Sequence, residues 1–487
     1  MTASSIGGAW TVWLVVAPML AAILAFLLPR AAVLVVLLNI GVTTSSALAL
    51  LQVVRDGAIR YELGGWAAPL GINLYADTLS SLLLFVAAIV ILAVALYSRS
   101  YRSRNGLSAF FWPIMMFLQA ALNALLVSAD VFNLYVTLEL LCLSAVALVA
   151  LAGNTSAVTA ALRYLIASVV ASLFYLLGVA LLYHAFGVLD LAMLADRVTP
   201  GPPLWAALGL MTAGLVLKGA LFPVHFWLPH AHAYAPSPVS ALLSALVIKA
   251  PFYVLLRLWY APFADAPAAV AELLGLLGAV AIVWGSLQAL RQERLKLLVA
   301  YSTVAQVGYL FLIFPLAQSL SAVRGVTVFI IGHALAKAGM FLAAGNIHSR
   351  LGHDRIQDLH RVARDMPLTL AAFSVAGVCI MGLPPSANFM GKWLLVEAAF
   401  AQGDWGWAVV VVAGSLLSAA YVFRVLGHAF TIAPGAGGGE RTPATMSWAA
   451  FLLALLALLL GLFVAPLIDM IGSPIEVASA PHVERAS

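Results

Sequence analysis

The sequence predicts an all-α polytopic membrane protein, and three observations support this prediction. Of the 487 residues, 64 % are hydrophobic and 9 % are charged, whereas about a quarter of the residues of soluble proteins are charged. The hydrophobic residues form long continuous runs, which indicate membrane-spanning helices. The formal charge of +5 comes from basic residues scattered among short loops, a distribution that indicates topology and predicts no nucleic-acid partner.

Fourteen spans are predicted if each needs about 20 apolar residues. The first has no positive charge before it, so we expect it to be retained rather than cleaved as a signal peptide. No loop is long enough for a soluble domain, and residues 1–487 should form one transmembrane domain. The expected spans are 9–28, 31–54, 76–97, 108–128, 130–152, 160–186, 204–226, 239–260, 268–290, 297–316, 324–348, 368–400, 406–431 and 447–471.

The loops predict the orientation of the chain, because lysine and arginine concentrate on the inner side of a membrane. With the N-terminus outside, the inner loops hold thirteen of these residues and the outer segments hold five. Both termini are therefore expected on the outer side. The most polar loop, 350–365, is predicted to form a short amphipathic helix on the inner side, and the tail 472–487 is expected to be disordered.

The lysines occupy unusual places. The chain has five lysines, and only Lys296 falls in a predicted polar loop, whereas Lys218, Lys249, Lys337 and Lys392 fall within apolar segments. A charged side chain at membrane depth costs about 2.5 to 3.5 kcal/mol on insertion scales, so such residues are usually functional. A buried lysine can lose its proton near neutral pH, whereas an arginine cannot. The cations that the sequence places in the membrane are therefore mainly ones that can titrate.

Two of these lysines lie beside predicted helix breaks. Pro223 follows Lys218 by five residues, and Pro384 and Pro385 precede Lys392 by eight and seven. Proline removes an intrahelical hydrogen bond, which is tolerated at membrane depth only against protein or water. The two breaks lie five spans apart, so the sequence predicts two inverted five-helix repeats with broken helices 7 and 12, a pattern typical of transporters.

These features divide the domain into four expected regions. An N-terminal three-helix region spans residues 1–107, the first repeat 108–260, the second, inverted repeat 268–431, and the last helix with its polar tail 447–487.

The ionisable residues within the spans predict a proton path. Glu139, in the fifth span, could pair with a lysine simply to allow insertion, but the same contact would also control when that lysine loses its proton. Lys218 and Lys249 lie on spans joined by a short loop and could face each other. A row of ionisable groups with water between them can carry protons through hydrocarbon.

His333 and Lys337 extend this row. They lie four residues apart and therefore share one helical face. His333 could be an interior histidine with a structural hydrogen bond, but beside a lysine a neutral imidazole relay is favoured. Lys392 would end the row, whereas Glu397 is interpreted as a charge at a helix end or an interface.

No metal or cofactor site is predicted. The spacing of His225, His230 and His232 fits no helical i, i+4 pair, and no carboxylate or cysteine accompanies them. Cys142 and Cys379 match no metal or redox spacing and are expected to be small packing residues. No phosphate-binding glycine loop follows a strand.

Several long motifs resemble one known family. In chain order they are DVFNLYVTLELL, LVLKGALFPVHFWLPHAHAYAPSPVSALLSALVIKAPFYVLLRL, RLKLLVAYSTVAQVGYL, GHALAKAGMFLAAG and GLPPSANFMGKWLL. Together they are similar to the antiporter-like, proton-translocating membrane subunits of respiratory complex I, membrane-bound hydrogenases and Mrp-type cation/proton antiporters. The resemblance implies fourteen helices, inner-membrane localisation, membrane-subunit partners and a central proton path. In that path Glu139 would pair with Lys218, Lys249 would bridge, and His333, Lys337 and Lys392 would continue it.

Within this family the lysine at 392 and the chain length favour the Mrp D-type subunit, whereas the complex I subunit nearest in pattern usually has glutamate at that position. The resemblance therefore implies transport of protons and a monovalent cation, sodium or another. The alternatives are a cofactor-free, proton-pumping subunit of an oxidoreductase and a lone carrier or passive scaffold. Asn388 departs from the family pattern, because it places a larger polar side chain near the second helix break.

Overall fold

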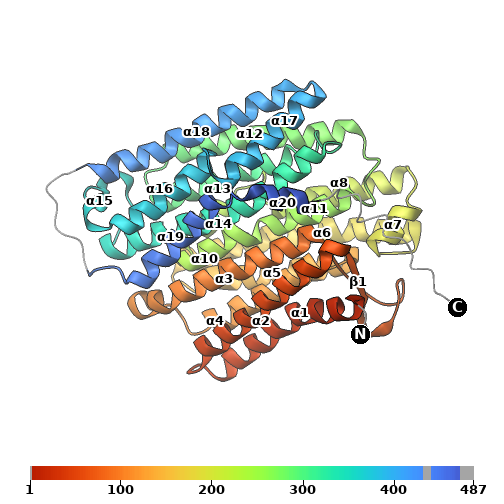
Figure 1. The fold of residues 1–487 in the computed structure, drawn as a ribbon, viewed down its shortest axis with the longest axis horizontal. Helices are drawn as coiled ribbons and strands as arrows, with labels where there is room; N and C mark the ends of the chain where they lie inside the picture. Colours follow the sequence, from red (N-terminus) through yellow and green to blue (C-terminus); the bar gives the residue numbers. More distant parts are fainter. Residues whose placement is uncertain (1–2, 432–439, 472–487) are drawn as a thin grey trace.

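The computed structural model describes residues 3–431 and 440–471, so the predicted tail 472–487 lies outside the described residues. Helices cross the molecule from one end to the other (Figure 1). Among the described residues, nine helical segments are long and apolar enough to cross a membrane, or ten if one bent pair counts as a single span. The protein is therefore a polytopic membrane protein, as predicted.

The long apolar helices are α1 (Ala3–Leu27), α2 (Ala32–Val53), α3 (Thr78–Asn105), α5 (Val131–Ala150), α6 (Thr155–Phe186), α12 (Ala268–Arg291), α14 (Leu320–Leu351) and α18 (Trp405–Phe430). A ninth long segment, Ser237–Trp259, consists of α10 (Ser237–Leu242), a π-helical turn (Leu243–Val247) and α11 (Lys249–Trp259). The remaining helices are α4 (Phe111–Leu126), α7 (Leu191–Arg197), α8 (Pro202–Lys218), α9 (Leu228–Tyr234), α13 (Leu295–Phe311), α15 (Val362–Asp365), α16 (Pro367–Met381), α17 (Ala387–Gln402), α19 (Ala444–Leu459) and α20 (Val464–Met470).

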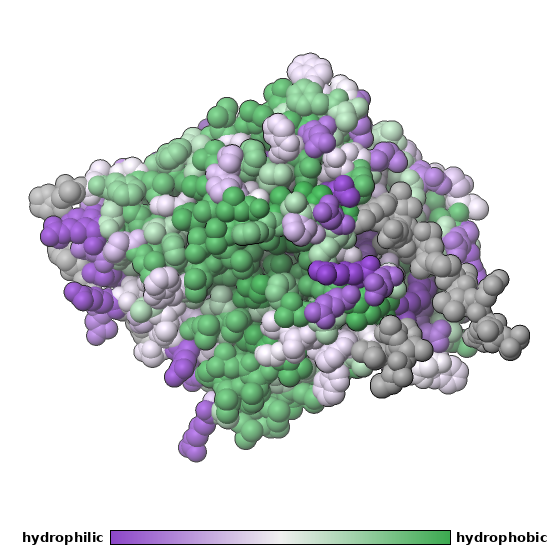
Figure 2. Space-filling model, viewed as in Figure 1, coloured by the Kyte–Doolittle hydropathy of each residue, from purple (hydrophilic) through white to green (hydrophobic). Residues whose placement is uncertain are grey.

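Two segments form the centre of the molecule. The apolar windows of Ser237–Trp259 and of α14 are completely buried by other helices. By contrast, α6 and α18 expose large apolar side chains such as Ile166 and Leu416. Figure 2 shows apolar residues covering the middle of one face and polar residues gathered towards its two ends, the distribution expected of a surface that contacts lipid.

The two ends of the molecule differ in structure. A small antiparallel hairpin of β1 (Ile59–Glu62) and β2 (Asn73–Ala76) marks one end, which we call the hairpin end. The opposite end, where α3 and α14 finish and α13 and α16 begin, is called the arginine-rich end. The hairpin is absent from the sequence prediction, because each strand has only four residues and lies inside a loop.

Two loop predictions need correction. The segment 350–365 forms no amphipathic helix: α14 stops at Gly352, whose φ is 76°, and the chain continues as a 3-10 turn (Ile356–Asp358) and the four-residue α15. Asp354 holds this segment against the start of α13 by accepting a 2.9 Å hydrogen bond from Arg294. Lys296 is predicted to lie in a loop, but the structure places it in the first turn of α13.

Candidate functional site

Lys218 and Glu139 form a buried ion pair. Lys218 is the last residue of α8, and its Nζ lies 2.6 Å from Oε1 of Glu139 on α5, with side-chain exposures of 1 % and 20 %. The same ammonium donates to Ser168 Oγ at 2.8 Å and lies 3.6 Å from Cys142 Sγ, while Ser172 donates to Glu139. Cys142, predicted as packing only, therefore also contributes to the surroundings of this lysine.

The chain breaks directly after Lys218, as predicted. Helix α8 ends there and α9 begins at Leu228, with Ala220 between them in the left-handed region at φ 53°. A left-handed conformation costs a residue other than glycine roughly 1–2 kcal/mol, so the surrounding packing must maintain it. Trp227 helps to do so, because its indole donates to the Leu217 carbonyl at 3.0 Å.

Lys249 begins α11, immediately after the π-helical turn. Its Nζ donates to the carbonyl of Ser244 inside that turn, and the Ser244 hydroxyl lies 3.0 Å from Thr303 Oγ1 on α13. π-Helical turns occur often at functional sites. This one turns a serine carbonyl towards a lysine and its hydroxyl towards the next helix.

Lys337 lies at the other end of this polar link. Thr303 donates to the Val299 carbonyl at 3.0 Å, and Lys337 Nζ donates to the same carbonyl at 3.1 Å and to the Ser302 hydroxyl. Polar groups of Ser244, Thr303 and Val299 thus connect the two amines. Such a network is strengthened by the low polarity of its surroundings.

His333 lies one helical turn before Lys337 on α14. Its imidazole is completely buried and stacks on Phe329, with ring centroids 5.7 Å apart. Neither ring nitrogen has a hydrogen-bond partner among the residues that the structure describes. Buried polar groups are rarely left unpaired, so these nitrogens are available to bind water.

Lys392 is held by the second helix break. Its Nζ donates to the carbonyls of Ile380 and Met381, at the end of α16, and to the Ser415 hydroxyl, each at 3.2 Å. The ammonium also lies 4.2 Å from the centroid of the Tyr309 ring, a cation–π contact. The break therefore provides the acceptors for the charge.

Gly382 makes this arrangement possible. Its φ is 76°, and a Cβ atom at this position would lie 2.7 Å from Lys392 Cδ. Only glycine combines that backbone conformation with room for the lysine side chain.

Polar side chains also lie between Lys337 and Lys392. Gln306, on the same helix as Ser302, donates to Ser418 Oγ at 3.2 Å, and Tyr421 donates to the same hydroxyl at 3.2 Å. Helix α13 therefore presents Ser302, Thr303 and Gln306 to the row of amines. These three residues were not predicted as members of the site, although three polar residues within five positions of an apolar span were a usable signal.

Asn388 lies in the first turn of α17, completely buried. A Cβ atom on Gly332 would collide with its Oδ1, which places the amide against the residue before His333. Neither amide atom of Asn388 has a partner among the described residues. An unpaired polar side chain on α17 thus lies against α14 next to the residue His333.

The remaining candidates lie outside this row. Glu397, interpreted as a charge at a helix end or an interface, is exposed on α17. His232 is buried and stacks on Phe341, with ring centroids 4.7 Å apart. Within residues 3–431 and 440–471, no group of three or more histidine, cysteine or acidic side chains is placed to hold a metal ion.

A pocket of about 340 Å³ opens at the arginine-rich end. Its lining includes Lys296, His348 and Asp354. Lys296 donates to the carbonyl of Ala235, which also lines this pocket, three residues after His232. The fifth lysine thus lies beside the short gap between α9 and α10.

Comparison with known proteins agrees with the geometry. A family model described as NADH:quinone oxidoreductase/Mrp antiporter, transmembrane, matches residues 128–418. The N subunit of the NADH-quinone oxidoreductase of Desulforudis audaxviator (strain MP104C) is 38 % identical over 431 residues, which cover 86 % of this chain and 85 % of that protein. The D subunit of the Na(+)/H(+) antiporter of Bacillus subtilis (strain 168) is 29 % identical over 476 residues, covering 93 % and 94 %.

One solved structure shares the fold along almost the whole chain. A chain of the Mrp complex from Dietzia sp. DQ12-45-1b superimposes with a TM-score of 0.89 and 24 % identity, covering 97 % of each chain.

Proposed function

The chain belongs to the NADH:quinone oxidoreductase/Mrp antiporter transmembrane family, and from this premise we propose that it is the proton-translocating subunit of a multi-subunit monovalent cation/proton antiporter. Sodium is the proposed cation, by analogy with the Na(+)/H(+) antiporter relative from Bacillus subtilis.

The observation that carries this proposal is the ion pair of Lys218 and Glu139. A lysine exposed by only 1 % needs its carboxylate to remain charged. When the pair is tight the ammonium keeps its proton, and when the pair loosens the proton can move on to the next acceptor. We assign the breaking and re-forming of the Lys218–Glu139 contact to the step that cation transport drives.

The proton path proposed from Lys218 runs across the molecule. Lys249, Lys337 and Lys392 are its further amines, and His333 relays between them as a neutral imidazole. The link through Ser244 and Thr303, and the carbonyls that hold Lys392, support this order. Water would complete the steps for which no direct hydrogen bond is described.

The proposed topology has fourteen spans, with inverted repeats in 108–260 and 268–431 between the N-terminal three-helix region and the last helix in 447–487. The long apolar segments, the bent pair of α19 and α20, and four shorter apolar helices support this count. The breaks after Lys218 and Met381 support the repeats, because each occurs beside a lysine of the path.

We also propose the inner membrane as the location, with both termini on its outer side. The arginine-rich end would then face the cytoplasm. Other membrane subunits are the expected partners, because the relatives named above are themselves designated as subunits of larger assemblies.

Lys218→Arg tests the function directly. Arginine keeps the positive charge near Glu139 but cannot release its proton, so sodium-dependent proton movement in vesicles should be lost while the complex still assembles. Glu397→Gln, which alters an exposed carboxylate on α17, is the control and should transport normally. Normal transport by Lys218→Arg would refute the proposal.

A second function is favoured by a specific observation, since the relative with 38 % identity is an NADH-quinone oxidoreductase subunit. In that case the same row of amines would pump protons for a redox complex. Purification of the intact complex separates the two: flavin or iron–sulfur subunits would indicate the oxidoreductase, and small membrane subunits alone would indicate the antiporter.

A further inference from the structure

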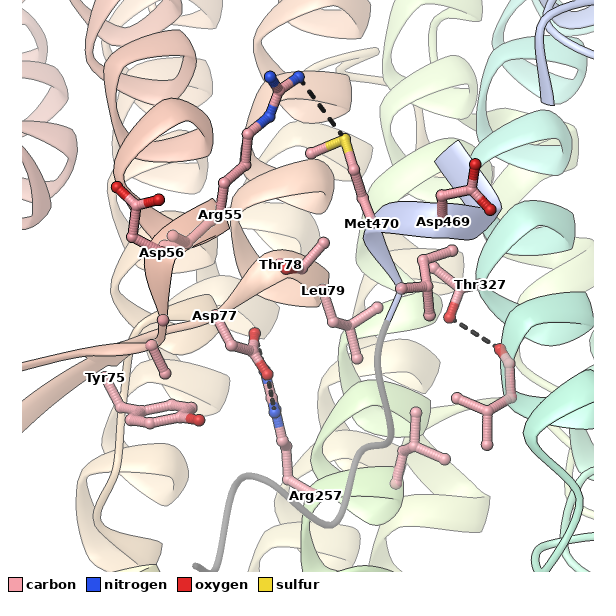
Figure 3. A pocket seen from close by; sticks show the side chains of 16 residues that line it. Arg55, Asp56, Tyr75, Asp77, Thr78, Leu79, Arg257, Thr327, Asp469 and Met470 are labelled. Atoms are coloured by element: carbon pink, nitrogen blue, oxygen red, sulfur yellow. Dashed lines mark hydrogen bonds and ion pairs between the residues drawn. The ribbon is translucent and has the colours of Figure 1, made fainter. Parts of the chain in front are cut away.

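A pocket of about 480 Å³ opens at the hairpin end, between the start of α3, the end of α11 and the start of α14. Figure 3 shows charged side chains from separate segments around it, including Arg55, Asp56 and Asp469. The proton path described above does not use this pocket. Two of the helices that line it, α11 and α14, nevertheless also carry Lys249 and His333.

One ion pair forms the inner wall. Arg257 on α11 donates to both carboxylate oxygens of Asp77, with both distances 2.6 Å, and the two side chains point at one another in Figure 3. Asp77 also caps α3, because it accepts a hydrogen bond from the Ser80 amide at 2.9 Å. A bidentate arginine–carboxylate pair of this kind holds both side chains in one geometry.

Aromatic rings enclose the guanidinium. Its carbon lies 4.9 Å from the Tyr253 ring centroid and 5.7 Å from that of Tyr75. Tyr75 is 5 % exposed and lines the pocket, and its hydroxyl has no partner among the described residues. A buried polar group aimed into the pocket indicates that water reaches this depth.

A second, smaller space lies farther inward along α11. A cavity of about 30 Å³ is lined by Lys249 and Tyr253 together with apolar residues of α3, α4 and α14. This volume suffices for one or two water molecules. Lys249, Tyr253 and Arg257 are each four residues apart, so they form one buried stripe about 12 Å long from the amine to the ion pair.

The facing helix connects the same two spaces. On α14, Val323 and Thr327 line the large pocket, and Ile330 and Ala334 line the small cavity. The pocket and the cavity therefore follow one seam between α11 and α14. Arg257, clamped by Asp77 and stacked on Tyr253, separates them.

We propose that this seam is a proton route between the hairpin-end pocket and Lys249, and that the Asp77–Arg257 pair is the gate that closes it. This inference rests on the proposed function, because it assigns Lys249 a connection to one side of the membrane. A fixed guanidinium repels protons and cations in a narrow passage. In the closed state the positive charge and the largely apolar cavity together prevent leakage past Lys249.

Asp77→Asn tests the gate, because it removes the charge that holds Arg257 while preserving the shape of the side chain. The intact complex is reconstituted in vesicles with an imposed pH gradient and no sodium, and a trapped pH-sensitive dye reports proton movement. The variant should lose the gradient, whereas the wild type should keep it. Adding Ala334→Leu, which fills the small cavity, should restore the gradient.

Asp190→Asn is the matched control. Asp190 also caps a helix at the hairpin end and pairs with an arginine, Arg60, at 3.4 Å, but it does not line the pocket. This variant should not leak. Ala180→Leu, on the exposed surface of α6, controls for the added side chain at Ala334.

Several results would overturn the gate. One is that vesicles with Asp77→Asn keep the pH gradient. Another is that the leak persists when Ala334→Leu is added to Asp77→Asn. A third is that Asp190→Asn leaks as much as Asp77→Asn. Should Asp77→Asn fail to assemble, Ala334→Leu alone decides the matter, because the route predicts that it reduces sodium-dependent transport and normal transport would refute the route. The proposed function itself is tested separately, by Lys218→Arg.

Discussion

Replacing Glu139 by glutamine is the most informative perturbation of the buried ion pair. The amide keeps the size of the side chain and can still accept hydrogen bonds from Lys218 and Ser172, which the carboxylate accepts in the wild type. Only the negative charge is lost. Lys218, with 1 % exposure, would then carry a charge in the interior with neutral partners alone.

The magnitude follows from the burial of the pair. Removing one partner of a buried ion pair costs about 3–5 kcal/mol, and the retained hydrogen bonds place this variant at the lower end. Because 1.36 kcal/mol corresponds to a factor of ten, a penalty of about 3 kcal/mol on charged Lys218 should slow a step that requires this charged form roughly 10²-fold. If proton transfer passes through that charged form, the transport rate should fall by a similar factor.

The assay is sodium-dependent collapse of a pH gradient in vesicles that contain the whole complex, with the amount of assembled complex measured in parallel. Glu397→Gln supplies the control, because it makes the same chemical change at an exposed position. A transport rate for Glu139→Gln within a few-fold of wild type, at equal assembly, would show that the carboxylate has no role in transport.

Three further predictions follow from other contacts. Ser302→Ala removes a hydroxyl that accepts from Lys337, and an unpaired buried donor costs about 1–3 kcal/mol, so transport should slow about tenfold or more. Gly382→Ala should both strain the backbone, at φ 76°, by about 1–2 kcal/mol and displace Lys392, so transport should fall more than stability. Although burial alone would raise the pKa of Asp77, the neighbouring guanidinium lowers it below its ordinary 3.8. The stabilisation by that pair is thus fully present above pH 3.8 and lost as the pH falls through the lowered value, so the melting temperatures of wild type and Asp77→Asn should differ by a constant amount between about pH 5 and 8.

The first two of these predictions have matched controls. Ser144→Ala removes an exposed hydroxyl that bonds only within its own helix, and transport should not change. Gly352→Ala imposes the same strain, at φ 76°, with nothing within 4 Å, so it should lower stability without slowing transport. Equal slowing by Gly352→Ala and Gly382→Ala, or a melting difference that shrinks near neutral pH, would contradict the corresponding argument.

Hydropathy and charge placement predicted the membrane class, the breaks after Lys218 and before Lys392, and the amines at depth. These features can be predicted from the sequence alone, because the cost of burying a charge or a proline depends mainly on where it lies along its own span. Predicting the pairing of Lys218 with Glu139 required the family resemblance, because the local sequence does not indicate which helices face each other.

The hydroxyl partners of the amines were not predicted for the same reason. Ser302 and Thr303 look like ordinary small residues of an apolar span until the facing helix places Lys337 against them. The Asp77–Arg257 pair joins residues separated by 180 positions, and no sequence pattern links them. The predicted helix at 350–365 failed because tertiary contacts of Asp354 outweigh the local amphipathic pattern.

The way in which Lys392 is held has a mechanical consequence. The carbonyls of Ile380 and Met381 end one half-helix, and the ammonium that satisfies them projects from the other half. If Lys392 carries protons as proposed, each departing proton would weaken the attraction that joins α16 to α17, and each arriving proton would restore it. The break would then act as a charge-sensitive hinge, through which the protonation of one amine moves a helix that a neighbouring subunit could contact.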